Sequence, residues 1–283
     1  MKKITIVLPL FNDWKSANII LNKINKIFFK SNFAVHVVII NDCSTNKITI
    51  GKTKFPFIKK IEIINLKKNL GSQKAIFIGL QYLYLNKNKS TIVVMDSDGE
   101  DNPSKIISLV KKVKNNPKYF VFVERTKRLE NFFLKFLNKI RLIITYLLTG
   151  KYFNIGNFSA FNSNLLKSIL ANKNLSLAYC SGVVKNHDKL IFLGFPKKKR
   201  FYGSSKVNIF FLLKYSINII SIFYKSVLLR TSILFLISLF YFNDFQEIFF
   251  FSILLVNFIF IANYFFNISF DHKKIIRNIK NIK

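Results

Sequence analysis

The sequence predicts an α/β fold with a mainly parallel β-sheet and flanking helices, followed by a C-terminal helical hairpin that spans a membrane. Two observations predict it. Over residues 4–124, short β-branched apolar runs alternate with stretches of helical apolar periodicity, and only short turns separate them. Hydrophobic residues make up 51% of the 283 residues, including 33 Phe, and they concentrate near the C-terminus. That is more than a soluble domain of this size needs.

The first half of the chain predicts five strands and three helices. The strands are expected at 4–8, 33–40, 61–66, 91–95 and 119–124, and the helices at 14–29, 69–85 and 103–114. The strand segments are rich in β-branched residues, whereas the first helix carries its apolar residues at helical spacing. We assume right-handed crossovers between the parallel strands.

Residues 91–103 read T-I-V-V-M-D-S-D-G-E-D-N-P, and the expected site is built around them. The apolar half suits a strand buried on both faces, and it stops abruptly at Asp96 and Asp98. Two carboxylates at the carboxyl end of a buried strand lie where open α/β sheets bind ligands. A divalent cation, Mg²⁺ or Mn²⁺, takes one or two such carboxylates and completes its shell with water and diphosphate oxygens. An ordinary Asp/Ser/Gly turn is the alternative.

Three strand ends bring carboxylates to one edge of the expected sheet: Asp13, Asp42 and the Asp96/Asp98 pair. With a helix amino-terminus near Gly71, they predict a site for a nucleoside diphosphate, one carboxylate serving a base N–H and the D-x-D turn a metal. A helix cap explains Asp13 equally well. The chain has no G-x-G-x-x-G after the first strand and no Walker G-K-[ST], which argues against a dinucleotide dehydrogenase or a P-loop NTPase.

Four segments resemble, in order, the successive motifs of family 2 glycosyltransferases with the GT-A fold. They are V-L-P-L-F-N-D (7–13), I-I-N-D-C-S-T (39–45), N-L-G-S-Q-K-A-I-F-I-G-L (69–80) and M-D-S-D-G-E-D-N-P (95–103). Further on, Y-G-S-S-K-V (202–207) resembles the G-x-S-K element of the polyprenyl-phosphate branch, the dolichol-phosphate mannose synthase-like enzymes. The resemblance covers about residues 3–270. It implies a nucleotide-sugar donor (a UDP- or GDP-sugar), Mg²⁺ or Mn²⁺, and a polyprenyl phosphate acceptor.

The resemblance also implies roles for individual residues. The donor-binding residues are Pro9, Asp13, Asp42 at the nucleoside, Lys74 near the diphosphate, and Asp96. Asp96 and Asp98 would hold the metal, and the catalytic candidates are Asp98, Glu100, Arg125 and Lys206. Glu100 stands where the family usually has Gln. Paired guanidinium groups at Arg125 and Arg128 suit an acceptor phosphate, with a solvated charged loop as the alternative.

Two asparagines depart from the family pattern. Asn41 replaces the first Asp of the usual pair, which is a mild change. Asn157 replaces an Asp that in many relatives is discussed as a base or an acceptor contact. Asn cannot take a proton, so base catalysis from position 157 is excluded. Transfer is still compatible with this change, because a phosphate monoester acceptor is already anionic at pH 7.

The formal net charge of +32 raises the question of nucleic-acid binding. The lysines are scattered through every element, and the chain has no recognisable nucleic-acid module, so we expect no nucleic-acid partner. A surface this basic favours anionic lipid headgroups and anionic substrates. Cys43 and Cys180 form no spacing pattern and are read as free thiols in a reducing compartment. The start of the chain has no signal peptide, so the N-terminal part is expected to stay in the cytoplasm.

The second half of the chain predicts membrane attachment. Residues 131–148 form an amphipathic helix expected to lie on the membrane surface, with a core-facing helix as the alternative. The expected organisation is a catalytic domain over 1–206, a juxtamembrane helix (or third span) over 207–225, two transmembrane helices over 226–270 and a basic cytoplasmic tail over 271–283. Basic flanks and an acidic turn between the spans place both termini in the cytoplasm.

The sequence therefore predicts an inverting, metal-dependent glycosyltransferase of the cytoplasmic membrane that transfers a sugar to a polyprenyl phosphate such as undecaprenyl phosphate. Two alternatives stay open. One is an enzyme of the same fold that acts on a cell-surface saccharide. The other is a non-catalytic, basic membrane-binding module that retains the fold.

Overall fold

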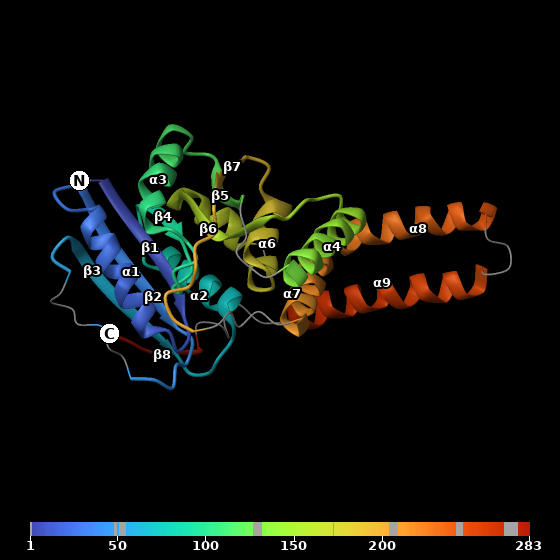
Figure 1. Ribbon diagram of the computed structural model, residues 1–283, viewed down its shortest axis with the longest axis horizontal. Helices are drawn as coiled ribbons and strands as arrows, with labels where there is room; N and C mark the ends of the chain where they lie inside the picture. Colours follow the sequence, from blue (N-terminus) through green and yellow to red (C-terminus); the bar gives the residue numbers. More distant parts are fainter. Residues whose placement is uncertain are drawn as a thin grey trace. The chain divides into compact units, whose positions relative to one another are not determined.

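The computed structural model describes residues 2–47, 50, 55–126, 132–171, 173–203, 209–241, 246–268 and 277–283 (Figure 1). The chain divides into two compact units. The sheet unit comprises Met1–Leu129, Ile155–Ser205 and Asp271–Lys283. The helical unit comprises Glu130–Asn154 and Lys206–Phe270. The units therefore differ from the expected division in two places: the helix at 131–148 groups with the apolar helices, and the C-terminal residues group with the sheet.

The sheet unit is built on a sheet in the order β7-β5-β6-β4-β1-β2-β3-β8. Its strands are β1 Lys2–Leu10, β2 Phe33–Asn41, β3 Ile58–Leu66, β4 Thr91–Val94, β5 Phe120–Arg125, β6 Ile155–Asn162, β7 Leu190–Phe195 and β8 Ile279–Ile282. Only β6 and β8 run antiparallel to their neighbours among these strands. The mainly parallel α/β sheet predicted from the sequence is confirmed.

Helices cover both faces of this sheet (Figure 1). On one face, α1 (Trp14–Ile27) and α3 (Ile106–Asn115) pack on alternate residues of the central strands, such as Ile4, Ile6 and Leu8 of β1. The other face is covered by α2 (Ser72–Leu85), with the short helices α5 (Leu166–Leu170) and α6 (Tyr179–Asn186) beside it. Because both faces are covered, the central strands are apolar throughout, which is the pattern that made them predictable.

Short 3₁₀ turns complete the connections: η2 Pro103–Lys105, η3 Ser163–Leu165 and η4 Lys173–Ser176. The helix expected at 103–114 thus begins as a 3₁₀ turn, with Pro103 in its first turn and the Asn102 side chain accepting from Ser104 N at 3.2 Å.

Three strands were not predicted from the sequence. β6 lies between β4 and β5, so the fifth expected strand is not a direct neighbour of the fourth. Its sequence I-G-N-F-S-A-F-N mixes polar and apolar residues without a β-branched run. β7 lies at one edge of the sheet and is half-exposed, and β8 is short and polar. Their stability comes from pairing with neighbours that only the tertiary fold provides.

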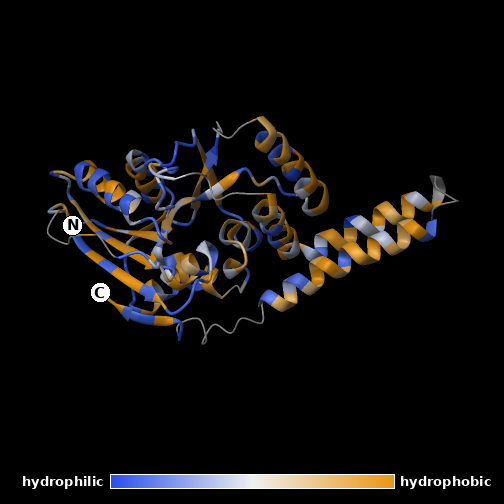
Figure 2. Ribbon diagram, turned by 60° about the horizontal axis from the view of Figure 1, so that its bottom comes forward, coloured by the Kyte–Doolittle hydropathy of each residue, from blue (hydrophilic) through white to orange (hydrophobic). Residues whose placement is uncertain are grey.

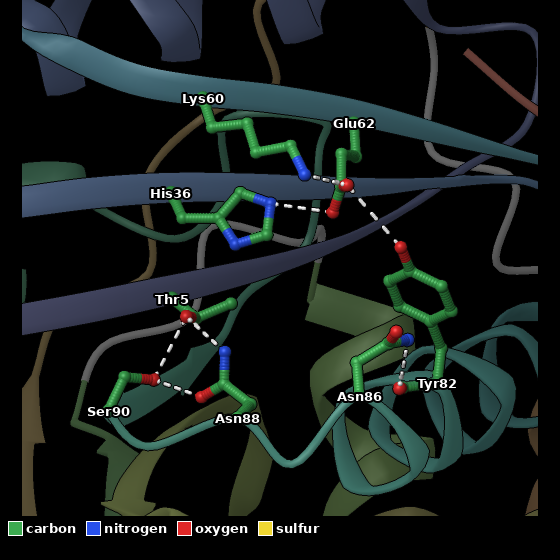
Figure 3. Close-up of polar contacts among 8 residues, drawn as sticks. All are labelled: Thr5, His36, Lys60, Glu62, Tyr82, Asn86, Asn88 and Ser90. Carbon is green, nitrogen blue, oxygen red and sulfur yellow. Dashed lines mark hydrogen bonds and ion pairs between the residues drawn. The ribbon is translucent and has the colours of Figure 1, made fainter.

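A polar cluster is buried in part between β1, β2, β3 and α2 (Figure 3). His36 Nε2 lies 2.8 Å from Glu62 Oε2, and Lys60 forms a further ion pair with Glu62. Tyr82 Oη donates to Glu62 Oε1 at 3.3 Å. Burial lowers the pKa of His36, although Glu62 opposes that shift. Burial acts to raise the pKa of Glu62, but pairing with Lys60 and His36 prevails and lowers it.

These shifts predict that the contributions of His36 and Glu62 to stability are lost in acid. In the unfolded chain His36 takes up a proton near its usual pKa of about 6.5, whereas in the folded chain its pKa is lower. Because the unfolded chain then binds more protons, the contribution of His36 to the free energy of unfolding falls as the pH drops below that value. Glu62 adds to the loss below about pH 4.5. We expect the melting temperature of the wild type to fall relative to that of His36→Gln between pH 7.5 and pH 5, because only the wild type carries the His36 contribution. Thermal melts in matched buffers test this, with His187→Gln as the control histidine, and a His36→Gln profile parallel to that of the wild type would contradict it.

The helical unit consists of α4 (Phe132–Thr149), α7 (Ile209–Ile222), α8 (Tyr224–Tyr241) and α9 (Gln246–Ile268). The helices α8 and α9 pair antiparallel (Figure 1), and Figure 2 shows that their residues are mostly hydrophobic. Between them, Asn257 Nδ2 of α9 donates to Thr231 Oγ1 of α8 at 2.9 Å. Polar side chains thus lie between the helices. The outer surface is apolar, with Leu229, Phe258 and Phe266 exposed by 65%, 68% and 85%.

Among the described residues, one helix, Gln246–Asn267, is long and apolar enough to cross a membrane. Leu212–Ile222 and Tyr224–Leu239 reach that length only as a pair, and the pair is bent by 88°. Arg230 in α8 donates from Nη1 to Leu147 O at 3.3 Å, at the carboxyl end of α4. A cation at this helix end is favoured by the helix dipole.

The amphipathic helix predicted at 131–148 forms as α4, and its orientation distinguishes between the two alternatives for it. The buried face carries Asn138, Leu142, Thr145 and Thr149. The apolar side chains point outward instead; those exposed are Phe132, Phe133, Phe136, Ile140, Ile143, Ile144 and Leu147. A core-facing helix would bury its apolar residues, so this arrangement contradicts that alternative.

Candidate active site

The predicted carboxylates follow three neighbouring parallel strands. Asp13 comes after β1, Asp42 after β2, and Asp96 and Asp98 after β4. Because β1 pairs with both β2 and β4 in parallel, these residues lie at one edge of the sheet, as the sequence predicts. This edge is the usual ligand site of open α/β sheets.

Asp42 is anchored to the loop that precedes α2. Its Oδ1 accepts from Leu70 N at 2.7 Å and its Oδ2 accepts from Gly71 N at 2.8 Å. Burial raises the pKa of Asp42, while these two backbone N–H groups oppose the shift. Gly71 has φ +86°, a conformation that favours glycine. The carboxylate thus joins two loops at the edge of the site.

The turn after β2 is held by amide side chains. Asn41 Oδ1 accepts from Ser44 N at 3.0 Å, and Asn41 Nδ2 donates to Asn65 Oδ1 at 2.7 Å. Asn12 Oδ1 accepts from Thr45 N at 2.8 Å. Asn41 stands where the family pattern has an Asp, which by sequence alone is a mild change. In the fold its N–H₂ group makes a hydrogen bond that a carboxylate cannot donate.

Side-chain oxygens of the D-x-D segment accept hydrogen bonds from the backbone of the same segment. Asp98 Oδ1 accepts from Glu100 N at 2.9 Å, and Asp101 Oδ2 accepts from Asp96 N at 2.9 Å. Gly99 has φ +95°, and a Cβ there would come within 2.5 Å of the Phe201 ring. Both conditions require glycine at this position.

The carboxyl groups of this turn are crowded together and shielded from solvent. Burial raises the pKa values of Asp96 and Asp98, and it raises the pKa of Asp101 to about 8. Asn157 Nδ2 donates to Asp96 Oδ1 at 2.9 Å and opposes the shift at Asp96, as does Arg125. Concentrated, desolvated carboxylates of this kind are a frequent property of functional sites.

A segment that the sequence analysis did not single out closes this edge. We call residues 196–201 the strap. Arg200 Nη2 lies 3.0 Å from Asp13 Oδ2, and Arg200 Nη1 lies 3.0 Å from Asp98 Oδ2. Phe201 N donates to Asp98 O at 3.0 Å, so main-chain contact fixes the strap as well. One guanidinium therefore joins two of the predicted site carboxylates.

The strap also binds Glu100, a predicted catalytic residue. Lys197 Nζ lies 2.9 Å from Glu100 Oε2, and Lys198 N donates to Glu100 O at 2.9 Å. The only sequence signal for this segment is a basic run, K-K-K-R, directly before the G-x-S-K-like element. A basic run is usually a solvated surface, so the pattern alone did not indicate a site.

The remaining predicted residues are placed as follows. Pro9 is in β1 and pairs with Ile40 of β2, and Lys74 lies half-buried in the first turn of α2. Arg125 ends β5, where its guanidinium lies 2.8 Å from the position of a Cβ on Gly156. Arg128 and Lys206 lie outside the described residues.

The donor set fits a divalent cation that shares its shell with a ligand. Among the residues that the structure describes, no group of three or more His, Cys, Asp or Glu side chains could hold a metal alone. Mg²⁺ and Mn²⁺ commonly take only one or two protein carboxylates beside phosphate and water. The Arg200 guanidinium between Asp13 and Asp98 shows that this position favours positive charge.

A mainly parallel sheet with an acidic D-x-D turn at its carboxyl edge defines a GT-A-like α/β protein. The chain belongs to glycosyl transferase family 2: the model of the family described as "Glycosyl transferase family 2" matches residues 5–172, more than half of the chain. The matched region includes Asp13, Asp42, Asp96 and Asp98, and so confirms the family resemblance found in the sequence motifs.

Two curated relatives match part of the chain. An uncharacterized glycosyltransferase, YkcC, of Bacillus subtilis is 29% identical over 133 residues, covering 46% of this chain and 40% of the relative. The uncharacterized protein MJ0544 of Methanocaldococcus jannaschii is 30% identical over 150 residues, covering 49% of this chain and 62% of the relative. The chain thus spans less than two thirds of the length of these relatives.

Solved structures share the fold. Glucosyl-3-phosphoglycerate synthase from Mycobacterium tuberculosis, in complex with Mn²⁺, UDP-glucose and phosphoglyceric acid, matches with a TM-score of 0.54 at 13% identity, over 81% of this chain and 79% of that one. The same protein in complex with phosphoglyceric acid alone gives a TM-score of 0.55 over 81% and 80% of the two chains. At this identity the likeness shows the GT-A-like fold.

Proposed function

We propose that the protein is an inverting glycosyltransferase that transfers a sugar from a UDP- or GDP-sugar to a polyprenyl phosphate at the cytoplasmic face of a membrane. The observation that carries the proposal is the acidic edge in a family 2 chain. There Asp13 and Asp98 both pair with the Arg200 guanidinium, and Asp96 is two residues from Asp98. An edge that already binds positive charge suits a cation-bound diphosphate.

The donor occupies the edge formed by β1, β2 and β4. Asp42 takes the nucleoside end, because it follows β2 and is held against the loop before α2. Lys74, in the first turn of α2, lies on the side where a helix amino-terminus attracts the diphosphate. Pro9 and Asp13 line the pocket on the side of β1. In this proposal the anomeric carbon faces Asp96 and Asp98.

Asp96 and Asp98 would hold Mg²⁺ or Mn²⁺. When bound, the cation supplies positive charge against the leaving diphosphate. The residues of the chain prepare its site: Asn157 orients Asp96 through the 2.9 Å hydrogen bond, and the backbone N–H of Glu100 orients Asp98. Arg200 neutralises Asp98 and Asp13 from the strap, so donor binding must share or replace that contact.

Transfer is a direct displacement. An oxygen of the acceptor phosphate attacks the anomeric carbon, the bond from that carbon to the donor diphosphate oxygen breaks, and the nucleoside diphosphate leaves with the bonding electrons. Configuration inverts because attack and departure occur on opposite faces. The acceptor is already anionic, so no side chain has to remove a proton. The absence of a base at position 157 is compatible with this step. The Asn157 side chain instead donates from Nδ2 to Asp96 Oδ1 and accepts from Gln73 Nε2 at 3.3 Å.

The helical unit supports a lipid acceptor. Its α4 helix exposes an apolar face, and α9 is long and apolar enough to span a membrane. We propose that α8 and α9 form a membrane hairpin, that α4 lies at the bilayer surface, and that the catalytic unit and both termini are cytoplasmic. Holding the enzyme at the bilayer raises the effective concentration of a polyprenyl phosphate. Anionic lipids would be further partners of the basic surface.

Nucleotide release with different acceptors tests this proposal. The full chain in nanodiscs would be incubated with UDP- and GDP-sugars, Mg²⁺ or Mn²⁺, and either undecaprenyl phosphate or an oligosaccharide. We expect release of nucleoside diphosphate that depends on undecaprenyl phosphate. Release that depends on the oligosaccharide would favour the saccharide-acceptor alternative. No release with any donor would favour a non-catalytic membrane-binding module.

A further inference from the structure

The C-terminal residues form part of the sheet that carries the site. β8 pairs antiparallel with β3, with Ile64 opposite Ile282 and Asn65 opposite Asn281. Main-chain hydrogen bonds extend the pairing on both sides, from Lys67 N to Asn278 O at 2.8 Å and from Ile63 N to Lys283 O at 2.9 Å. Residues expected to be a basic tail thus form an edge strand beside β3 (Figure 1).

A relay of asparagine amides leads from this strand to the site. Asn65 Nδ2 donates to Asn281 Oδ1 at 2.6 Å, and Asn41 Nδ2 donates to Asn65 Oδ1 at 2.7 Å. Asn41 Oδ1 in turn accepts from Ser44 N at 3.0 Å. Each amide donates toward the C-terminal strand and accepts from the side of the site, so the orientations of Asn41 and Asn65 depend on the acceptor that Asn281 supplies.

The interior of this relay is buried. Asn41 and Asn65 are 7% and 9% exposed, so an amide N–H₂ group left without a partner there cannot turn freely to water. Leaving a buried donor unpaired is costly, and the nearest relief is rotation of the side chain. Rotation of Asn65 removes the acceptor from Asn41, and rotation of Asn41 releases the Ser44 backbone. The effect of Asn281 thus reaches the turn that contains Asp42.

We propose that Asn281, acting through Asn65 and Asn41, is a positioning residue for the nucleoside end of the donor pocket. This inference rests on the proposed function, because it assigns the 41–45 turn to nucleotide binding. The turn is fastened on its other side by Asn12, whose Oδ1 accepts from Thr45 N at 2.8 Å. The Asn281 relay holds the side next to Asp42. Its loss weakens nucleotide binding and leaves the chemistry at Asp96 and Asp98 intact.

The test compares Asn281→Ala with Asn281→Asp in the full chain. Alanine removes the acceptor, whereas aspartate retains an oxygen that accepts from Asn65 Nδ2. Lys280→Ala is the matched control, because it changes an exposed neighbour on the same strand. Binding of UDP and of GDP would be measured by calorimetry with Mn²⁺ present. Hydrogen exchange of the 42–46 amides, and kcat and KM for the donor, would be measured in parallel.

We expect Asn281→Ala to weaken nucleotide binding and raise the donor KM by about fivefold, which corresponds to the loss of one hydrogen bond. We expect kcat to change by less than twofold, and the 42–46 amides to exchange faster while those of β1 do not. Asn281→Asp and Lys280→Ala should bind as the wild type does.

Wild-type nucleotide affinity in Asn281→Ala would overturn the inference. So would equal weakening in Asn281→Asp, or faster exchange throughout the sheet, because either result would mean that the strand acts only through general stability. A wild-type protein that binds neither UDP nor GDP would instead overturn the proposed donor site, and the inference with it.

Discussion

Asp98→Asn is expected to reduce the rate of sugar transfer by about 100-fold or more, which is the size of effect seen when a group that stabilises developing charge is removed. Asp98 lies at the carboxyl end of β4, where its Oδ1 accepts from Glu100 N and its Oδ2 contacts Arg200. Asparagine retains the shape and removes the negative charge. The fold should therefore persist while the affinity for a divalent cation and its diphosphate falls.

Initial rates at several Mn²⁺ concentrations would measure this effect, together with a thermal melt of each variant. Asp188→Asn is the matched control, because Asp188 is exposed and lies away from the acidic edge. A rate for Asp98→Asn within threefold of that of the wild type would contradict the assignment of Asp98 to the site.

Arg200→Ala is expected to lower the free energy of unfolding by about 2–4 kcal/mol when no divalent cation is present. Removal of one partner from a largely buried ion pair leaves the other charge uncompensated, and here two carboxylates lose the same partner. The side chains of Arg200, Asp13 and Asp98 are only 17%, 14% and 16% exposed. Mn²⁺ can take over the lost positive charge, so it should stabilise Arg200→Ala more than it stabilises the wild type.

Thermal melts with EDTA and with millimolar Mn²⁺ test this prediction through stability alone, without any assay of transfer. Lys199→Ala removes an exposed positive charge from the same strap and should melt like the wild type under both conditions. Arg200→Lys should recover only part of the stability, because a single ammonium cannot make the forked contact. Equal responses of Arg200→Ala and the wild type to Mn²⁺ would show that the cation does not occupy the edge that Arg200 neutralises.

The parallel core of the fold could be predicted because its evidence is local. Each central strand is a β-branched apolar run that ends in an acidic or asparagine-containing turn, and parallel pairing brings such turns to one edge. Asp13, Asp42, Asp96 and Asp98 therefore follow strands that end at the same edge of the sheet, as expected. The apolar helices near the C-terminus were predictable for a similar reason, since continuous hydrophobicity indicates a membrane-spanning helix or a buried one.

The parts that escaped prediction depend on contacts between distant segments. Arg200 joins Asp13 across 187 positions of the chain, and Asn281 joins Asn65 across 216. Nothing in a lysine-rich run, or in a short polar strand such as β8, signals these partners. For α4 the periodicity shows that the helix has two faces and does not show which face is covered, so the structure was needed to choose between the expected surface helix and its core-facing alternative.

Transfer of radiolabel into lipid is the most direct test of the central claim. Membranes containing the protein would receive undecaprenyl phosphate, Mg²⁺ or Mn²⁺, and a panel of radiolabelled UDP- and GDP-sugars, followed by extraction into organic solvent. We expect lipid-phase label that requires the divalent cation, the polyprenyl phosphate and Asp98. Donor turnover that leaves the organic phase unlabelled, or lipid label that persists in Asp98→Asn, would contradict it.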